Sequence, residues 1–367
     1  MLNVGMVGVG CISGIYLKNF AETFKDVKLV AVCDLIRERA EQAQEKYNIP
    51  KLYDTMEELF ADPEIDIVLN LTRPYQHYEV SRGALLAGKH VYSEKPLGAD
   101  WEEGTALVAL AQEKGLWIGG APDTFLGAGI QSCRKFIDEG NLGKVIGGRC
   151  VMAHRGVESW HPDPDFYYQR GGGPLLDMGP YYITALINLL GGVTEVYGKS
   201  QTTFSQRLIT AQPHVGETIT VNVPTHYDCI MTFASGATVT FLTTFDTYDL
   251  KEPNILLYGE KGNLRVPDPN CFGAERGMKF FNGETKTEED LPLTFDYDVN
   301  SRCLGLADLA AAIEQGRSPR TSYKQTYHVL EVMTGIMKSA ESGVPYKMTT
   351  SFTREAPMDP TLPHGVL

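Results

Sequence analysis

A lysine that could do chemistry lies at the end of a short apolar segment, in the tetrapeptide Ser93-Glu94-Lys95-Pro96. Ligands of parallel α/β sheets bind at the carboxyl ends of the strands, so this loop should face a ligand. An ammonium group there can lower the cost of negative charge on a substrate oxygen while a hydride leaves the neighbouring carbon. The same residues also allow a second interpretation, in which Lys95 is an ordinary surface lysine in a turn before Pro96.

A glycine-rich loop follows the first apolar segment and opens a helical pattern. Gly8 permits a tight turn, Gly10 lets the backbone approach a pyrophosphate at the helix N-terminus, and Ser13 is small enough for close packing. Asp34 follows about 20 residues later, where the ribose hydroxyls of a dinucleotide are bound. This context predicts a dinucleotide site rather than a plain turn. The cofactor contacts expected in the loop are Gly8, Gly10, Cys11, Ile12 and Ser13.

The same aspartate bears on the choice of cofactor. A carboxylate accepts hydrogen bonds from the two ribose hydroxyls and repels a 2′-phosphate, which favours NAD over NADP. Arg37 and Arg39 follow Asp34 closely and could pair with such a phosphate. We expect both arginines on the solvent face of the next helix instead.

The elements that must position these groups alternate over the first third of the chain. Short apolar segments and helical patterns follow one another, which predicts a parallel α/β sheet. We expect a Rossmann NAD-binding domain over residues 1–122, with strands at residues 4–9, 28–33, 65–71, 90–93 and 117–120. Helices are expected at residues 36–47, 75–87 and 101–114, the last of them capped by Asp100 and Gly115.

The pattern changes after residue 122. Helices are expected at residues 130–139, 176–190, 304–315 and 323–342, and strands at 193–203, 218–223, 227–233, 237–245 and 255–258. Consecutive strands separated by turn residues predict an α+β domain with an open, mostly antiparallel sheet over residues 123–367. One face of such a sheet needs a cover of helices, and the other needs a second subunit or a polar coat. The tail from Phe352 is expected at the surface.

Composition excludes several classes of protein. A length of 367 residues suits two domains, and a net charge of −13 argues against nucleic acid as a partner. No apolar run approaches the ~20 residues of a membrane span, and the first residues lack a secretory signal. The seven cysteines are scattered and the eight histidines show no ligand spacing, so we expect reduced thiols in a cytoplasm and no metal.

Four ordered signatures together resemble the Gfo/Idh/MocA family, named for glucose–fructose oxidoreductase and inositol dehydrogenase. They are the glycine-rich start, the segment 71–77 after the third strand, Glu94-Lys95-Pro96, and a glycine turn at 171–173 that leads into Asp177-Met178-Gly179-Pro180-Tyr181. The resemblance runs in order over residues 1 to about 190. It implies a Rossmann domain joined to an α/β domain with an open sheet that often forms oligomers, so we expect a homodimer or homotetramer.

The resemblance also implies roles for individual residues. Lys95 would be the catalytic lysine, Asp177 the carboxylate that orients substrate, and Tyr181 the proton-transfer residue. Glu94 would contact the cofactor or support the lysine. The residues implied at the nicotinamide end are Thr72, Pro74 and His77.

This chain has Tyr181 where many members of the family have histidine. On one helix Asp177 and Tyr181 would project from the same face, one turn apart. A phenol ordinarily keeps its proton at neutral pH, and the nearby ammonium of Lys95 would favour the phenolate. The other interpretation makes Asp177 an ordinary helix residue and Tyr181 a core aromatic, and Tyr182 is expected to point elsewhere.

The loop over residues 154–170 is dense in aromatic and hydrogen-bonding groups, as sugar pockets are. Trp160 could stack on a sugar ring, and His161 could bind a hydroxyl or serve as the base in place of Tyr181. Alternatively, Trp160 and Phe166 only pin a long loop.

The leading hypothesis is therefore an NAD-dependent dehydrogenase or reductase acting on a sugar or cyclitol. Two alternatives remain open. Some relatives cleave glycosides through a transient oxidation that retains NAD, and other family members only sense NAD and sugar. Lys95 favours an enzyme over a sensor.

Overall fold

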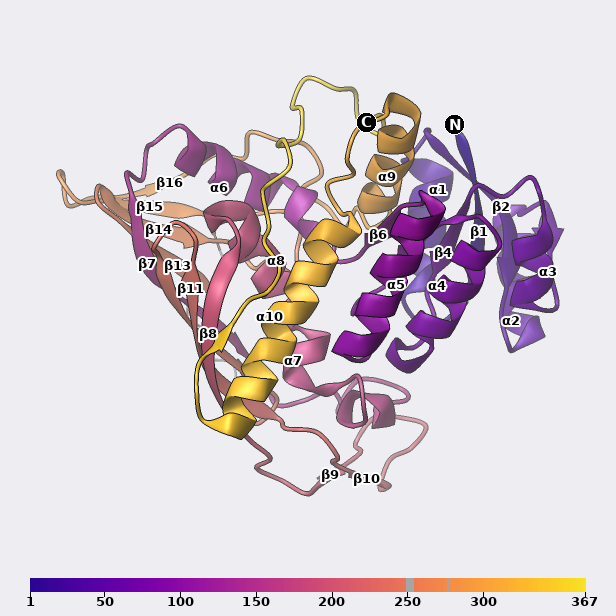
Figure 1. Cartoon of the computed structure of the whole chain (residues 1–367), viewed down its shortest axis with the longest axis horizontal. Coiled ribbons are helices and arrows are strands. Elements are labelled where there is room, and N and C mark those ends of the chain that lie inside the picture. Colours follow the sequence, from indigo (N-terminus) through magenta and orange to yellow (C-terminus); the bar gives the residue numbers. More distant parts are fainter. Residues whose placement is uncertain (249–253, 276) are drawn as a thin grey trace. The chain divides into compact units, whose positions relative to one another are not determined.

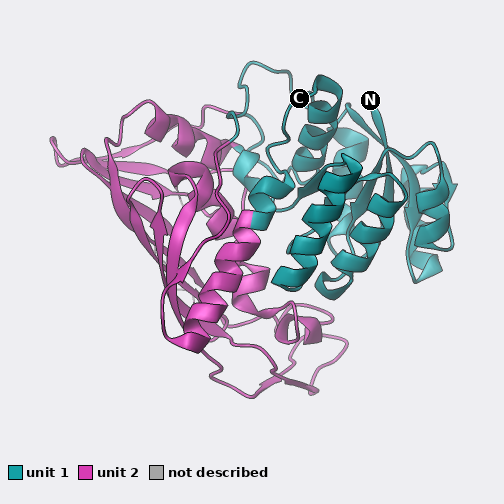
Figure 2. Ribbon diagram, in the orientation of Figure 1, with its two compact units in different colours: residues 1–127, 296–327, 355–367 teal, residues 128–295, 328–354 magenta. Residues whose placement is uncertain are grey.

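The computed structural model describes residues 1–248, 254–275 and 277–367. These residues form two compact units (Figure 2): residues 1–127, 296–327 and 355–367 make up the first, and residues 128–295 and 328–354 the second. The division differs from the single boundary expected after residue 122, because the chain returns to the first unit near its end. Backbone bonds hold the returning segment there, since the N–H of Gly120 donates to the carbonyl oxygen of Thr321 at 2.9 Å.

The first unit is built on a six-stranded sheet in the order β3-β2-β1-β4-β5-β6. Every neighbouring pair is parallel, which confirms the predicted parallel sheet. The order is that of dinucleotide-binding doubly wound folds, in which helices cover both faces. The strands are β1 (Leu2–Val7), β2 (Val27–Cys33), β3 (Lys51–Leu52), β4 (Ile67–Asn70), β5 (His90–Ser93) and β6 (Ile118–Gly120).

The helices of this unit begin and end at recognisable caps. In α5 (Trp101–Lys114) the carboxylate of Asp100 accepts from the N–H of Glu103 at 2.9 Å, and Gly115 ends the helix at φ 65°. The short strand β3 and the helix α3 were not predicted. The remaining helices are α1 (Ser13–Glu22), α2 (Arg37–Tyr47), α3 (Met56–Ala61), α4 (His77–Leu86) and α9 (Leu304–Gln315), with 3-10 turns η1 (Pro74–Gln76) and η2 (Thr124–Leu126).

The second unit is built on a nine-stranded sheet in the order β16-β15-β14-β13-β7-β12-β11-β8-β17. Only β7 and β12 pair in parallel, so the sheet is mostly antiparallel, as predicted. Its strands are β7 (Val145–Ala153), β8 (Val193–Gln201), β11 (His226–Phe233), β12 (Thr238–Thr244), β13 (Ile255–Gly259), β14 (Gly262–Val266), β15 (Lys279–Asn282), β16 (Glu288–Asp290) and β17 (Tyr346–Lys347).

Helices cover one face of this sheet (Figure 1). They are α6 (Ala128–Asp138), α8 (Gly179–Leu190) and the later part of α10 (Tyr323–Ser342). Burial alternates along β11, where Tyr227, Cys229 and Met231 are buried and Ile230 is exposed. A separate pair of strands, β9 (Gln206–Leu208) and β10 (Thr218–Thr220), lies outside the large sheet. The strand expected at residues 218–223 was predicted to belong to the large sheet, and it is instead part of this separate pair.

The helix expected over residues 176–190 is two helices, so that prediction was wrong. The first, α7 (Gly173–Asp177), ends before Met178, and α8 begins at Gly179. Pro180 explains the break, because a proline has no backbone N–H and its ring disfavours helical geometry in the preceding residues. Asp177 and Tyr181 therefore lie on two consecutive short helices.

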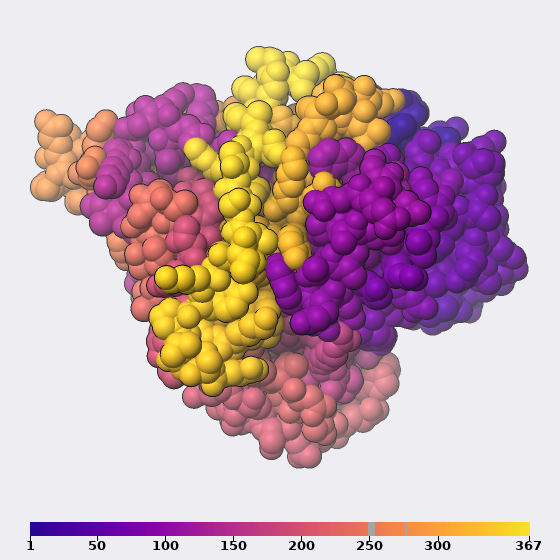
Figure 3. Space-filling model, in the orientation of Figure 1, coloured from indigo at the N-terminus to yellow at the C-terminus, as the bar shows by residue number. Residues whose placement is uncertain are grey.

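The end of the chain lies at the surface, as Figure 3 shows in yellow. Most side chains from Phe352 onward are exposed or half-buried, with exceptions such as Met358 and Leu367. All seven cysteines carry free thiols. Within the described part of the chain, the helices are all too short or too polar to cross a membrane.

Candidate active site

The glycine-rich loop has the backbone geometry that a pyrophosphate site requires. Gly8 has φ +100°, and a Cβ there would come within 2.9 Å of the backbone of Leu71. A Cβ on Gly10 would meet no described protein atom within 4 Å, so the backbone can be approached closely at this point. Ser13 is buried and its hydroxyl donates to the carbonyl oxygen of Gly10 at 2.7 Å, which closes the loop onto the start of α1. The loop therefore fits a dinucleotide.

Asp34 lies beside this loop at the end of β2. One carboxylate oxygen accepts from the N–H of Val9 at 2.6 Å, and the other accepts from the N–H of Ile36 at 2.7 Å. Each oxygen of a carboxylate keeps a further lone pair, so the group can still accept from ribose hydroxyls. Arg37 is exposed and paired with Glu41 and Asp54, and Arg39 is exposed, as expected for both.

The loop after β4 is fixed by buried amide and imidazole groups. The side chain of Asn70 accepts from the hydroxyl of Thr72 at 2.6 Å and donates to the carbonyl oxygen of His77 at 3.1 Å. His77 is buried, and its ring nitrogens lie 2.8 Å from the carbonyl oxygen of Pro96 and 3.0 Å from that of Thr72. Burial lowers the pKa of His77, and the two carbonyl oxygens oppose this shift. The ring thus joins the loops after β4 and β5, while Pro74 begins η1.

Lys95 extends from the carboxyl end of β5 and is half-buried. The residue before it, Glu94, is buried and holds the turn in place. Its N–H donates to the carbonyl oxygen of Asn70 at 2.9 Å, and its carboxylate accepts from the N–H of Lys95 at 3.1 Å. The phenol of Tyr16 donates to the other oxygen of that carboxylate at 2.9 Å. Sequence reasoning missed Tyr16, which lies on the inner face of α1, three residues after Ser13.

In the second unit, Asp177 is the half-buried last residue of α7, and Tyr181 is buried in the first turn of α8. The next tyrosine points into the core. The hydroxyl of Tyr182 accepts from the side chain of Asn254 at 3.0 Å and lies 3.4 Å from the carboxylate of Asp268. Tyr182 is thus engaged in the core, and Tyr181 is the better candidate for proton transfer.

A histidine that sequence reasoning did not single out lies near Asp177. The N–H of His154, directly after β7, donates to the carbonyl oxygen of Thr244 at 3.2 Å, and its ring packs 4.7 Å from that of Phe245. Burial lowers its pKa, and the carboxylate of Asp177 opposes this shift. Because Nδ1 accepts from the N–H of Gly156 at 3.1 Å, the neutral ring carries its proton on Nε2. His154 thus presents a hydrogen-bond donor in the same part of the unit as Asp177.

The loop at 154–170 has an aromatic centre. His161 is buried, its Nδ1 accepts from the N–H of Asp163 at 3.0 Å, and its ring meets the edges of Phe166 and Tyr167. Trp160 is 63% exposed. Phe166 therefore packs against other rings of the loop, as the pinning alternative expects, whereas Trp160 is mostly exposed and could present a face to a sugar ring.

A buried arginine ties this loop to the segment that carries β9. The guanidinium of Arg207 lies 2.7 Å from the carboxylate of Glu158 and 3.1 Å from that of Asp246. It also donates to the carbonyl oxygen of Phe245 at 2.8 Å. The phenol of Tyr168 donates to Glu158 as well. These contacts fix the loop around His161 through charged side chains that lie far apart in the sequence.

Comparison with known proteins identifies the family. Residues 2–119 match the model described as "Oxidoreductase family, NAD-binding Rossmann fold" (GFO_IDH_MocA), and residues 130–265 match the C-terminal domain model of the same family. The chain belongs to the Gfo/Idh/MocA family.

Curated relatives within the family are dehydrogenases. The chain is 32% identical to trans-1,2-dihydrobenzene-1,2-diol dehydrogenase of Bos taurus over 194 residues, which is 52% of this chain and 56% of the relative. It is 34% identical to inositol 2-dehydrogenase of Salmonella paratyphi B over 115 residues, 31% of this chain and 34% of that one. The chain thus aligns with little more than half the length of the first of these enzymes.

Solved structures of similar fold cover nearly the whole chain. An NAD binding oxidoreductase from Klebsiella pneumoniae has a TM-score of 0.81 at 21% identity, over 95% of this chain and 99% of that one. Levoglucosan dehydrogenase in complex with NADH has a TM-score of 0.80 at 20% identity, with the same coverage. At these identities the likeness shows a shared fold, which extends over both units.

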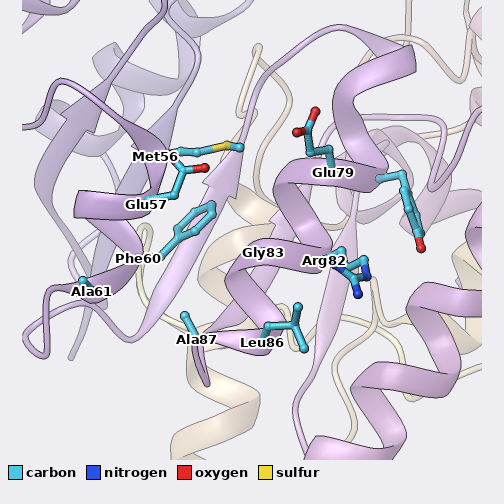
Figure 4. A pocket seen from close by; sticks show the side chains of 10 residues that line it. Met56, Glu57, Phe60, Ala61, Glu79, Arg82, Gly83, Leu86 and Ala87 are labelled. Carbon is cyan, nitrogen blue, oxygen red and sulfur yellow. The ribbon is translucent and has the colours of Figure 1, made fainter.

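A groove elsewhere in the first unit lies outside the family's motifs. It runs between α3 and α4, where Met56, Phe60, Arg82 and Leu86 line it (Figure 4). It contains none of the residues assigned above to cofactor or substrate, so we give it no part in the site. In the described ranges, no group of three or more histidine, cysteine, aspartate or glutamate side chains is placed to hold a metal ion.

Proposed function

We propose that this member of the Gfo/Idh/MocA family is an NAD-dependent oxidoreductase that moves a hydride to or from a hydroxyl-bearing ring carbon of a sugar or cyclitol. One observation carries the proposal: Lys95, at the carboxyl end of β5, belongs to the same parallel sheet edge as the Gly8–Gly10 turn and Asp34. A dinucleotide held by that turn would bind at the carboxyl ends of the strands, the edge to which Lys95 belongs.

Lys95, Asp177 and Tyr181 divide the chemistry. A bound nicotinamide accepts or supplies the hydride. The ammonium of Lys95 stabilises negative charge on the substrate oxygen, and the phenol of Tyr181 exchanges the proton of that hydroxyl. Asp177 accepts a hydrogen bond from a neighbouring hydroxyl and so orients the ring. The names of the relatives, a ring diol and a ring polyol dehydrogenase, support a substrate with adjacent hydroxyls.

NAD is the proposed cofactor, and its contacts are those of the glycine-rich loop, Asp34, Thr72, Pro74, His77 and Glu94. The surroundings of Asp34 are acidic, since Glu38, Glu41 and Asp54 lie on or beside α2 and the last two pair with Arg37. A 2′-phosphate would meet repulsion here and find Arg37 already engaged. Tighter binding of NADPH than of NADH in a fluorescence titration would contradict this assignment.

We also propose that the chain forms a homodimer or homotetramer through the uncovered face of the nine-stranded sheet. Cross-strand register places Tyr197 beside Ile230 on that face, with Thr240, Arg149 and Leu256 following in the same row. Ile230 is 44% exposed and Phe281 of β15 is 37% exposed. A monomeric mass by light scattering at micromolar concentration would overturn this part of the proposal.

The experiment that tests the function is a substrate panel with NAD, followed by NADH absorbance. The panel contains inositols, aldoses, levoglucosan and trans-1,2-dihydrobenzene-1,2-diol. Glycosides of these compounds are assayed in parallel. Net NADH formation from a free polyol is the expected result. Glycoside cleavage without net NADH would indicate the hydrolase alternative, and binding of NADH without turnover of any compound would indicate a sensor.

A further inference from the structure

A buried phenol lies directly behind the turn that carries Lys95. The side chain of Tyr16 is 0% exposed, and its hydroxyl donates to the carboxylate of Glu94 at 2.9 Å. The other oxygen of that carboxylate accepts from the backbone N–H of Lys95 at 3.1 Å. The three residues form one chain of hydrogen bonds from α1 to the end of β5. Hydrogen bonds to a carboxylate are stronger than those between neutral groups.

The side chain of Glu94 is buried, at 8% exposure. Burial raises the pKa of Tyr16 well above its usual value, so the phenol keeps its proton and remains a donor. A buried carboxylate is costly unless hydrogen-bonded donors stabilise it, and Tyr16 and the N–H of Lys95 are such donors. The titratable and charged groups that act on this pair from neighbouring elements are His77, Tyr92, Lys95, Asp123 and Arg302.

We propose that Tyr16 is a positioning residue for Lys95. Its phenol holds the Glu94 carboxylate in one orientation, and that carboxylate fixes the backbone from which the lysine side chain extends. The inference rests on the proposed function, since it assigns Tyr16 a part in turnover through Lys95. Tyr16 itself does not touch substrate.

The structure offers a matched control in Tyr92. Its side chain is also 0% exposed and belongs to β5 of the same sheet. Among the residues that the structure describes, none makes a hydrogen bond with its hydroxyl. Tyr16→Phe and Tyr92→Phe therefore remove the same buried atom, but only the first removes a bond to Glu94.

Turnover is measured as kcat and KM on the best substrate of the panel, with the Kd for NADH from fluorescence. Tyr16→Phe should lower kcat about 10-fold, the scale of one lost bond to a charged group, with KM and the Kd within about 2-fold. Tyr92→Phe should keep kcat within about 2-fold.

A double variant shows whether Tyr16 acts through Glu94. Glu94→Gln should lower kcat more than Tyr16→Phe does, and adding Tyr16→Phe to Glu94→Gln should change kcat by less than about 2-fold. If the two substitutions lower kcat by factors that multiply in the double variant, the proposal is overturned. An unchanged kcat in Tyr16→Phe would overturn it as well. Loss of NADH binding in Tyr16→Phe would also overturn it, since the phenol would then serve the cofactor site.

A readout without substrate keeps this inference separate from the proposed function. Hydrogen exchange of the Lys95 amide should be about 10-fold faster in Tyr16→Phe than in wild type, and unchanged in Tyr92→Phe. Equal exchange in all three proteins would overturn the positioning role even if wild-type turnover is found. Absence of turnover in wild type, with faster exchange in Tyr16→Phe, would overturn the proposed function and leave the bond from Tyr16 to Glu94 established.

Discussion

Asp34 and His77 of the first unit are held by backbone atoms, whereas the loop that carries Trp160 and His161 in the second unit is tied down largely by side chains. Asp34 accepts from two backbone N–H groups, and His77 bridges two backbone carbonyl oxygens. In the second unit, Glu158 and Asp246 meet on the guanidinium of Arg207, and Tyr182 bonds to side chains. The backbone of a turn follows from local sequence, but side-chain partners meet only after the whole sheet has formed.

This difference predicts where each unit tolerates change. A backbone-held site depends on glycines and turn geometry, so substitutions on its surface should leave it intact. A site held by buried charges should fail when one charge is removed, because its partners are left desolvated and unpaired.

The largest expected effect comes from breaking the buried ion cluster. Arg207→Met leaves Glu158 and Asp246 without their cation, and we expect the free energy of unfolding to fall by about 3–5 kcal/mol. Arg37 is the matched control, because it also pairs with two carboxylates but is exposed. Arg37→Met should change stability by about 0.5 kcal/mol or less. Urea denaturation measures both, and equal losses would abolish the distinction between the two kinds of site.

The next effect concerns Tyr181, which is buried without being part of that cluster. Tyr181→Phe keeps the ring but removes the proton, so kcat should fall at least ~10²-fold while stability changes little. Tyr181→His should recover part of the activity with a lower pH optimum, since imidazole titrates near ~6.5. Tyr182→Phe serves as the control and should cost about 1 kcal/mol of stability with activity kept. Near-normal turnover in Tyr181→Phe would shift the assignment of the base to His161.

A smaller effect tests the backbone-held region by pH. Burial raises the pKa of Asp123 to about 6. The N–H of Gly305 and the charge of Arg302 oppose this rise. In the unfolded chain an aspartate titrates near ~3.9, so the folded state binds more protons between these values and stability falls as pH rises through them. Asp123→Asn keeps an acceptor for the N–H groups of Cys303 and Gly305 and cannot ionise.

The free energy of unfolding of Asp123→Asn should therefore match that of wild type near pH 4 and exceed it by about 2–3 kcal/mol at pH 7. Thermal or urea unfolding across that range measures the difference. Parallel pH curves for the two proteins would show that Asp123 ionises in the folded state as easily as in the unfolded chain.

Local signals explain which parts of the fold could be predicted. The bounds of α5 follow from Asp100 and Gly115, and α9 and α10 were predicted at their observed residues. The bounds of the strand β7 were not predicted, because Gly147 and Gly148 interrupt its apolar pattern. The capping box of α3, Thr55 with Glu58, was visible in the sequence but marks a helix of only six residues.

The candidate site shows the same limit. The glycine-rich loop and Glu94-Lys95-Pro96 are contiguous, so their motifs could be found by spacing. The partners of Arg207 lie 49 and 39 positions away, and Tyr16 lies 78 positions from Glu94, so no local pattern joins them. The break at Met178 could have been foreseen from Pro180, which ends helical geometry in the residues before it.

Hydride transfer by wild type and by Lys95→Ala tests the central claim most directly. The substrate that forms NADH in the panel is prepared with deuterium on its hydroxyl-bearing carbon, and the cofactor is recovered for mass analysis. Wild type should transfer the label to the cofactor, and Lys95→Ala should do so at least ~10²-fold more slowly while binding NADH with a nearly unchanged Kd. Label-free NADH from wild type, or full activity in Lys95→Ala, would contradict an oxidoreductase that uses this lysine.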